Sequence, residues 1–234
     1  MRIRFYLKLL FIGVCSLISS ISIAAEEMTK TGILLDESWK ATVYEFAQEN
    51  LQHSAWGVEH YERNFHMSKK IAAAESTKVD EDVLFAASFL HDMGVFEPYA
   101  IAGAEHSKTA ADNIEAILNP TNFPNEKIED VKATILAHMF YADAGDNKMA
   151  AIFHDADTLD FLGSIGVARI ISITTRDDWA TDLATAIKTI EGFNVDLPSK
   201  LIFEGSKEIA KKRVNESNMF IESLKSESND GNAL

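Results

Sequence analysis

Cysteine is almost absent from this sequence of 234 residues, in which Cys15 is the single example. One thiol cannot form an intramolecular disulfide, and it cannot supply a cysteine-ligated zinc site. The sequence also lacks a glycine-rich phosphate loop, a Gly-x-Gly-x-x-Gly turn and a Gly-x-Ser-x-Gly nucleophile motif. These absences exclude disulfide scaffolds, and they argue against P-loop nucleotide hydrolases, dinucleotide-binding enzymes and serine hydrolases.

Cations are also few, because 22 Lys and Arg residues stand against 36 Asp and Glu residues, which gives a formal net charge of −14. Such an acidic chain is poorly suited to bind a nucleic-acid backbone. Apolar residues make up 47% and charged residues 25%, an ordinary balance for a globular domain with a sizeable core. If the protein acts on anions, it needs local cations or a metal ion at its site.

The first 24 residues have the pattern of a secretory signal peptide, with three early cations, an apolar stretch to about Ser19 and small residues before Ala24. We expect cleavage after Ala24 or Ala25 and a periplasmic or secreted product. Cleavage would remove Cys15 and three cations, leaving a net charge of −17. The alternative is an uncleaved anchor, but the apolar stretch is short for a membrane span, so no stable span is expected after cleavage.

The remaining chain is predicted to be all-α and to form one domain over residues 36–223, with its core at about 55–175 and a flexible tail at 224–234. Apolar residues recur at helical spacing, and no alternation long enough for a strand is present. The expected helices begin near residue 38 and then cover residues 58–76, 80–91, 104–118, 125–140, 148–172, 177–191 and 204–223. Four basic residues on the last helix are interpreted as a solvated face: Lys207, Lys211, Lys212 and Arg213.

The most informative stretch is the apolar run of residues 83–90, which leads directly into His91 and Asp92. Only Ser88 in this run is polar, so the run predicts a buried helix. An imidazole and a carboxylate at the end of a buried helix are unfavourable unless both have partners. A metal ion is the partner that best suits this pair.

Further metal ligands come from other predicted helices, which contain His60 and Asp157. Converging helices can place two imidazoles and two carboxylates around one ion. Nitrogen and oxygen ligands without sulfur suit Mn²⁺, Fe²⁺, Co²⁺ or Mg²⁺ better than a closed structural zinc site. An ion with open positions can lower the pKa of a bound water and polarise a phosphoryl oxygen.

These residues resemble the His…His-Asp…Asp signature of the HD-domain metal-dependent phosphohydrolase superfamily. The signature is carried by His60-x-x-Arg63, by His91-Asp92 with the following Met-Gly, and by Asp157. Residues 106–110 and 155–169 are similar to stretches of the small, stand-alone members, and the resemblance covers about residues 55–175. In that family an aliphatic residue usually follows the arginine, whereas Asn64 stands here.

The resemblance implies a helical HD-domain fold with a divalent ion, Mn²⁺, Mg²⁺, Fe²⁺ or Co²⁺, held by four residues: His60, His91, Asp92 and Asp157. It also implies that Asp92 and Arg63 are catalytic, with the guanidinium of Arg63 near the substrate phosphate. The substrate would be a small phosphate-containing anion. The sequence contains no signal of an oligomeric state.

Two further histidines, His106 and His138, occur in the order in which binuclear members carry additional ligands. They are predicted to hold a second metal or to contact substrate, and the alternative is that they line the pocket or cap helices. His154 is interpreted as a structural histidine, and Asp160 as a partner of Arg63 or Arg169.

The sequence therefore predicts an exported phosphohydrolase that hydrolyses a phosphomonoester through a metal-activated water. A nucleotide-like phosphomonoester is one option for the substrate. Three alternatives stay open. They are a binuclear phosphodiesterase, a di-iron oxygenase similar to the inositol-oxygenase branch of the superfamily, and a non-catalytic binding protein that retains the ligands.

Overall fold

The computed structural model describes residues 27–176 and 180–234. The predicted signal peptide and the predicted helix cap at Asp177-Asp178 lie outside the described residues. The described part contains nine α-helices: α1 Ser38–Asn50, α2 Val58–Ala74, α3 Glu81–Leu90, α4 His106–Leu118, α5 Ile128–Leu136, α6 Lys148–Asp160, α7 Gly163–Ser172, α8 Leu183–Asp196 and α9 Glu204–Glu227. Short 3₁₀ turns cover Met93–Val95, Asn119–Thr121, Asn125–Lys127 and Leu197–Lys200.

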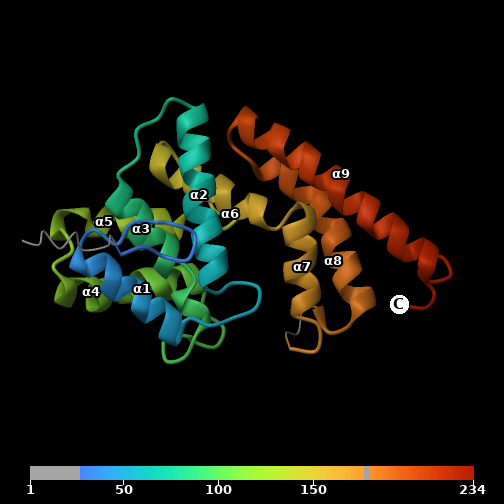
Figure 1. The fold of residues 1–234 in the computed structure, drawn as a ribbon, viewed down its shortest axis with the longest axis horizontal. Helices are drawn as coiled ribbons and strands as arrows, with labels where there is room; N and C mark the ends of the chain where they lie inside the picture. The colour runs from blue at the N-terminus through green and yellow to red at the C-terminus, as the bar shows by residue number, and fades with distance from the viewer. Residues whose placement is uncertain (1–26, 177–179) are drawn as a thin grey trace, which may run out of the picture.

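The all-α prediction is confirmed, since the described residues contain no strand and β pairing is limited to one isolated bridge between Met28 and Leu34. Helices α1, α3, α4 and α5 gather on one side, and α7, α8 and α9 on the other, with α2 and α6 between them (Figure 1). Helix α2 packs along α6, and α9 packs on α7. Over the described ranges, no helix has both the length and the apolar character that crossing a membrane requires.

Helix α3 is the buried helix that the apolar run predicted, because every residue from 83 to 90 is buried. The Asp80 side chain caps it by accepting hydrogen bonds from the backbone N–H groups of Asp82 and Val83, at 3.0 and 3.3 Å. Trp39 of α1 meets Phe85 edge-on at 5.4 Å between ring centroids. This packing fixes the end of α3, where His91 and Asp92 follow, in the centre of the bundle.

The single helix predicted for residues 148–172 is wrong, because α6 ends at Asp160 and α7 begins at Gly163. Gly163 has a φ of +76°, which favours glycine and turns the chain. A Cβ on Gly166 would lie 2.1 Å from the carbonyl oxygen of Phe161, so this glycine allows the new helix to pass close to the preceding backbone. Both glycines therefore serve the break between α6 and α7, and Gly163 also allows Arg213 of α9 to pack closely, since an added Cβ would lie 3.0 Å from Arg213 Cβ.

Other boundaries shift by a few residues. Helix α5 ends at Leu136, so His138 follows the helix and its Nδ1 lies 2.6 Å from the Ile135 carbonyl oxygen. Helix α8 begins at Leu183, where the Asp182 side chain accepts a hydrogen bond from the Thr185 N–H at 2.7 Å. Helix α9 continues to Glu227, and residues 228–234 form turns.

Candidate metal centre

The four predicted ligands come together from three separate helices. His60 lies on α2, His91 and Asp92 follow α3, and Asp157 lies on α6. All four side chains are buried. The packing of α2 on α6 and on α3 brings these positions to one point inside the bundle.

Their ligand atoms lie at the spacing that one ion requires. His60 Nε2 is 3.1 Å from Asp157 Oδ1 and 3.2 Å from His91 Nε2, and His91 Nε2 is 3.2 Å from Asp92 Oδ2. The two longer separations, His60 to Asp92 and His91 to Asp157, are 3.6 and 3.7 Å. Bonds of about 2.0–2.2 Å place neighbouring ligand atoms about 3.0 Å apart in an octahedron and about 3.4 Å apart in a tetrahedron. The residues therefore fit a divalent ion.

The two second-tier histidines lie against the other oxygen of Asp92. His106 Nε2 and His138 Nε2 are 3.2 Å apart, and each is 3.6 Å from Asp92 Oδ1. Oδ2 of the same carboxylate faces His60 and His91. One carboxylate thus has a pair of imidazoles at each oxygen, an arrangement that can hold two ions on either side of Asp92.

Both ligand carboxylates are held in their ionised form. Burial alone would raise the pKa of Asp92, but the neighbouring His91 and His138 outweigh burial and hold the pKa well below its ordinary value. Burial likewise opposes ionisation of Asp157, but the hydrogen bond and charge of His60 lower its pKa to about 2. Buried carboxylates that stay charged at neutral pH favour a bound cation.

Asp160 supports the site from behind His60. Its Oδ2 lies 2.7 Å from His60 Nδ1, so a proton on Nδ1 leaves Nε2 free to bind a metal. Arg63 contacts the same carboxylate at 2.8–3.2 Å, and Arg169 Nη1 lies 2.9 Å from Oδ2. Burial opposes ionisation of Asp160, but the charge of Arg169 and the hydrogen bonds from His60 and Arg63 hold its pKa well below the ordinary value.

The predicted contact of Arg63 with the substrate phosphate stays a prediction, and the structure shows the other contacts of this side chain. The Arg63 guanidinium donates hydrogen bonds to the Asp160 carboxylate, and Arg63 lines a separate cavity with His66 and Arg213. Arg63 lies three residues after His60 on α2, so both side chains reach Asp160 on α6. Asp160 thus pairs with both arginines that the sequence offered.

Arg169 is the arginine that lines the metal pocket. It lines a cavity of about 430 Å³ together with His60, Asp92, His106 and Asp157. Its Nε donates to the Ala55 carbonyl oxygen at 2.7 Å, and its guanidinium stacks 4.5 Å from the Phe161 ring. The rest of the wall is apolar or aromatic: Trp56, Val95, Met139, Phe140, Phe161 and Phe193. The signal in the sequence was that Arg169 is the single charged residue of the segment that forms α7.

Asn64 is a second residue of the site that sequence reasoning did not assign. Its amide is fully buried, and Nδ2 donates to Asp157 Oδ1 at 2.8 Å and lies 3.3 Å from His60 Nε2. Its Oδ1 is buried without a hydrogen-bond partner among the described residues. The departure from an aliphatic residue at this position therefore places an amide against two metal ligands.

His154 is structural, as expected. Its Nδ1 lies 3.2 Å from Asp155 Oδ1, and Asp155 accepts hydrogen bonds from the backbone N–H groups of Ile202 and Phe203 at 2.8 and 3.0 Å. This second His-Asp pair ties α6 to the segment before α9, away from the metal centre.

Comparisons with known proteins agree with this site. Residues 57–162 match the family model of the HD domain. No curated protein matches the sequence. A protein of Lactobacillus plantarum has a similar structure, with 21% identity, a TM-score of 0.58 and coverage of 86% of this chain and 98% of that one.

Two further solved structures are similar. A predicted HD superfamily hydrolase from an uncultured Thermotogales bacterium has 19% identity and a TM-score of 0.55, with 81% of this chain and 90% of that chain covered. Bacillus subtilis YpgQ in complex with ADP has 17% identity and a TM-score of 0.59, with 80% and 97% covered. At these identities the structural likeness shows the fold. Since the residues matched by the family model include all four predicted ligands, the HD-domain resemblance predicted from the sequence is confirmed for residues 57–162.

Proposed function

We propose that this protein is a metal-dependent phosphohydrolase that acts on a phosphomonoester. The observation that carries the proposal is the cluster of two imidazoles and two carboxylates, with ligand atoms 3.1–3.7 Å apart, at the wall of a cavity that also contains Arg169. A divalent ion held by His60, His91, Asp92 and Asp157 would supply Lewis acidity and an activated water. The protein supplies the position of the substrate and the charge around it.

The cavity favours a substrate with a phosphate at one end and a flat apolar group at the other. Its volume of about 430 Å³ lies within the range of small-molecule sites. Arg169 can attract the phosphate, and the aromatic walls can pack against the remainder. ADP in the complex with YpgQ has this combination of groups, which supports a nucleotide-like substrate for this chain.

Each neighbouring residue has a defined task in this proposal. Asp160 holds the proton of His60 on Nδ1 and keeps Nε2 directed at the ion. Asn64 donates to Asp157 Oδ1 and fixes the orientation of that carboxylate. Arg169 is buried and anchored on the Ala55 carbonyl, so its charge reaches the cavity from a fixed point.

A phosphodiesterase is the second candidate, favoured by the pair of histidines at Asp92 Oδ1. Two ions on either side of Asp92 can stabilise both the attacking and the leaving oxygen. His106 and His138 would then be ligands, and their replacement would reduce the metal content from two ions to one. The same geometry could carry two irons, and a redox-active di-iron signal without hydrolysis would identify the oxygenase alternative.

The test is metal analysis of the purified chain together with hydrolysis of phosphomonoesters and phosphodiesters in Mn²⁺, Mg²⁺, Fe²⁺ and Co²⁺. Asp92→Ala should abolish both metal binding and turnover. Asp146→Ala, which changes an exposed loop carboxylate, is the matched control and should keep both. Full activity of Asp92→Ala would refute the proposal.

We also propose that the protein is exported through residues 1–24. The expected result is a mature chain that begins at residue 25 or 26, measured by mass spectrometry of fractionated cells. A full-length chain retained in the cytoplasm would refute export without affecting the proposed reaction.

A further inference from the structure

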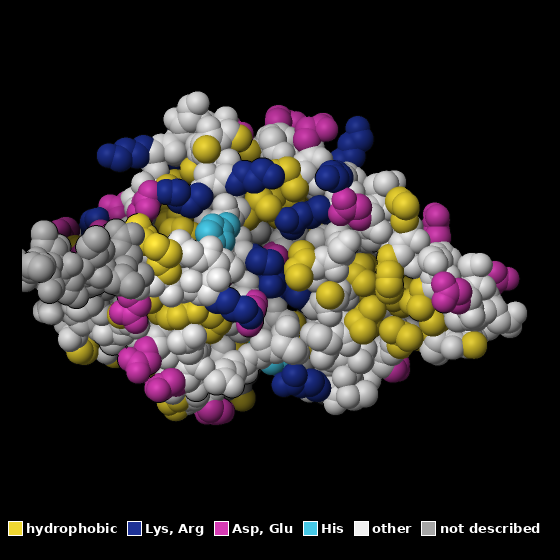
Figure 2. Space-filling model, in the orientation of Figure 1, with side chains coloured by type: hydrophobic (Ala, Val, Ile, Leu, Met, Phe, Trp, Pro, Cys, Tyr) yellow, Lys and Arg dark blue, Asp and Glu magenta, His cyan; other side chains and the backbone are white. Residues whose placement is uncertain are grey.

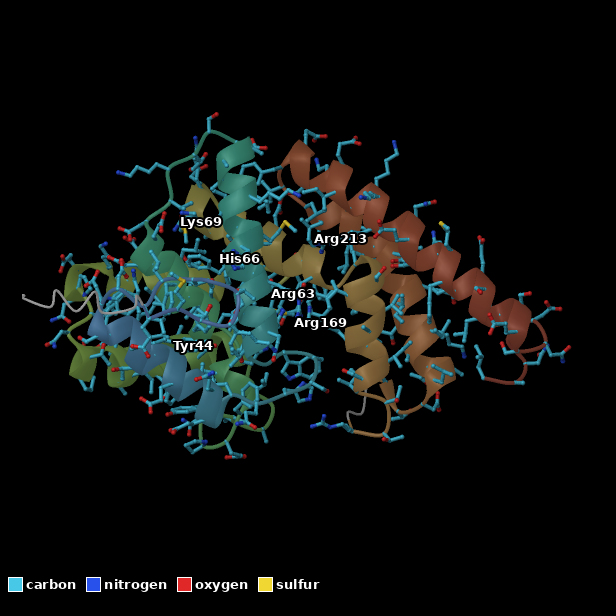
Figure 3. All side chains as sticks on the ribbon, viewed as in Figure 1. Tyr44, Arg63, His66, Lys69, Arg169 and Arg213 are labelled. Atoms are coloured by element: carbon cyan, nitrogen blue, oxygen red, sulfur yellow. The ribbon has the colours of Figure 1, made fainter. Side chains whose placement is uncertain are left out.

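A second cavity lies on the other side of Asp160 from the metal pocket, at the seam between α2 and α9. It has a volume of about 270 Å³, and we call it the α2–α9 cavity. Its lining is Thr31, Arg63, His66, Met67, Lys70, Ala156, Asp160 and Arg213. Figure 3 shows Arg63 and His66 on the α2 side of this seam and Arg213 on the α9 side.

Positive charge exceeds negative charge in this cavity. Three cations, Arg63, Lys70 and Arg213, share the lining with one carboxylate, Asp160. Arg169 contacts that carboxylate as well, at 2.9 Å, so its negative charge is already opposed by two guanidiniums. Figure 2 shows Lys and Arg side chains gathered along this face of an otherwise acidic protein.

Arg213 and Lys70 are the cations without a compensating partner. Neither makes an ion pair with a carboxylate within residues 27–176 and 180–234, whereas the adjacent Lys69 pairs with Glu81. Arg213 is half-buried, and its Nη1 donates to the Leu159 carbonyl oxygen. Burial lowers the pKa of Arg213, although the negative charge of Asp160 acts in the opposite direction. A partly desolvated guanidinium held in a fixed direction is favourable mainly if an anion completes its environment.

The sequence interpretation of the last helix therefore needs one correction. Lys207 contacts Glu204 at 2.6 Å, and Lys212 lies 3.9 Å from Glu216, as expected for a solvated face. Arg213 instead turns toward the junction of α6 and α7, where it donates to the Leu159 carbonyl oxygen and packs over Gly163, so that a Cβ added to Gly163 would lie 3.0 Å from Arg213 Cβ. It is thus a component of the cavity.

We propose that the α2–α9 cavity binds a small phosphate anion, orthophosphate or diphosphate. Arginine offers paired donors that match phosphate oxygens, and two arginines face this cavity from α2 and α9. The volume corresponds to about nine water molecules, which leaves room for one or two phosphoryl groups and little more. The volume lies just below the usual range of about 300–1,000 Å³ for larger ligands, which favours a small anion over a complete nucleotide.

This proposal can be tested apart from the proposed phosphohydrolase reaction, because the lining of the cavity contains none of the four predicted metal ligands. Binding is therefore measured on the metal-free full chain, by titration calorimetry with orthophosphate and with diphosphate at low ionic strength. Without an ion, the metal centre presents carboxylates that repel anions. A chain that binds no phosphate in this titration would not contradict the proposed hydrolysis. A chain that shows no hydrolysis would not contradict phosphate binding in the α2–α9 cavity.

Matched variants separate a built site from general charge attraction. Arg213→Gln should weaken binding by about tenfold or more, because a charge-assisted hydrogen bond is removed. Lys70→Gln should weaken it by about threefold, as expected for an exposed cation. The neighbouring changes Lys212→Gln and Lys69→Gln remove the same charge outside the cavity and should change the affinity by less than about twofold.

The titration has defined refuting outcomes. The proposal would be overturned if the wild-type chain bound no anion at about 10–20 mM, a concentration at which even weak sites fill. Equal losses in all four variants would also overturn it, since they would indicate diffuse attraction. Lys70 is exposed, so its variant keeps the test decisive even if Arg213→Gln does not fold.

Discussion

Replacement of Asp160 by Asn tests how the metal centre is supported. The carboxylate contacts three positively polarised groups, His60 Nδ1 at 2.7 Å, the Arg63 guanidinium at 2.8 Å and Arg169 Nη1 at 2.9 Å. A neutral amide of the same size would keep the packing and remove the charge. The variant therefore measures the electrostatic contribution of this single group.

The expected loss of stability follows from the burial of the partners. Arg169 is only 3% exposed, so removal of its counterion leaves a buried charge, which costs about 3–5 kcal/mol. The Arg63 side chain is 32% exposed, and its pair with Asp160 is screened by solvent, so it adds less than about 1 kcal/mol. Urea denaturation of the metal-free protein should therefore show a decrease of about 3–5 kcal/mol in the free energy of unfolding.

The same variant should weaken metal binding by about 10–100-fold, the usual effect of removing the partner that orients a ligand histidine. Asp155→Asn is the matched control, because Asp155 is also buried on α6 but accepts from backbone N–H groups of Ile202 and Phe203. It should lower stability and leave metal affinity unchanged. An Asp160→Asn protein with wild-type metal affinity would refute the role of Asp160 in orienting His60, and a stability loss below about 1 kcal/mol would refute the argument from burial.

Four further outcomes are expected. Asn64→Leu should weaken metal binding by about tenfold in calorimetry, because Asp157 loses its amide donor; unchanged affinity would contradict this role. Gly166→Ala should destabilise the protein by at least about 2 kcal/mol, since the added Cβ meets the Phe161 carbonyl. Gly192→Ala on α8, where an added Cβ meets no atom, should stabilise the protein by about 0.5–1 kcal/mol. Chemical denaturation of both variants checks the difference. The pKa of Asp157 is lowered to about 2, so its contribution to stability is present above about pH 4 and is lost as the pH falls toward 2; circular dichroism should show acid unfolding in that window. Chelation of a bound ion should lower the melting temperature, by an amount equivalent to about 2.7 kcal/mol when the free ion had been at 100 times its dissociation constant.

Local chemistry in the sequence predicted the helices and the convergence of the ligands. The run before His91 could be identified as buried because it contains almost no polar residue, and Asp80 has the side chain of a helix cap. The break at residues 161–162 escaped prediction because it depends on the backbone of Gly163 and on the approach of Phe161 to Gly166. Both effects arise from local backbone conformation, about which helical periodicity carries no information.

The roles of the arginines could not be assigned from the sequence for a related reason. Arg63 and Arg169 are separated by more than a hundred residues, and both reach Asp160. Which of them faces the metal pocket depends on the direction in which α2 and α7 meet α6. Asn64 was visible as a departure from the family pattern, but its contact with Asp157 required the relative rotation of α2 and α6.

The placement of cations explains how a chain with a net charge of −14 can accept anions. At physiological ionic strength, charges farther away than about 8 Å are largely screened, so the local balance decides what a cavity attracts. Asp160 is the common counterion of Arg63 and Arg169, which face two different cavities. The α2–α9 cavity keeps an excess of positive charge because Lys70 and Arg213 line it as well, whereas in the metal pocket Asp92 and Asp157 outnumber Arg169, so a bound cation is needed there to attract an anion. The Asp160 carboxylate also orients His60, so the metal centre and the arginines of both cavities depend on a single buried residue.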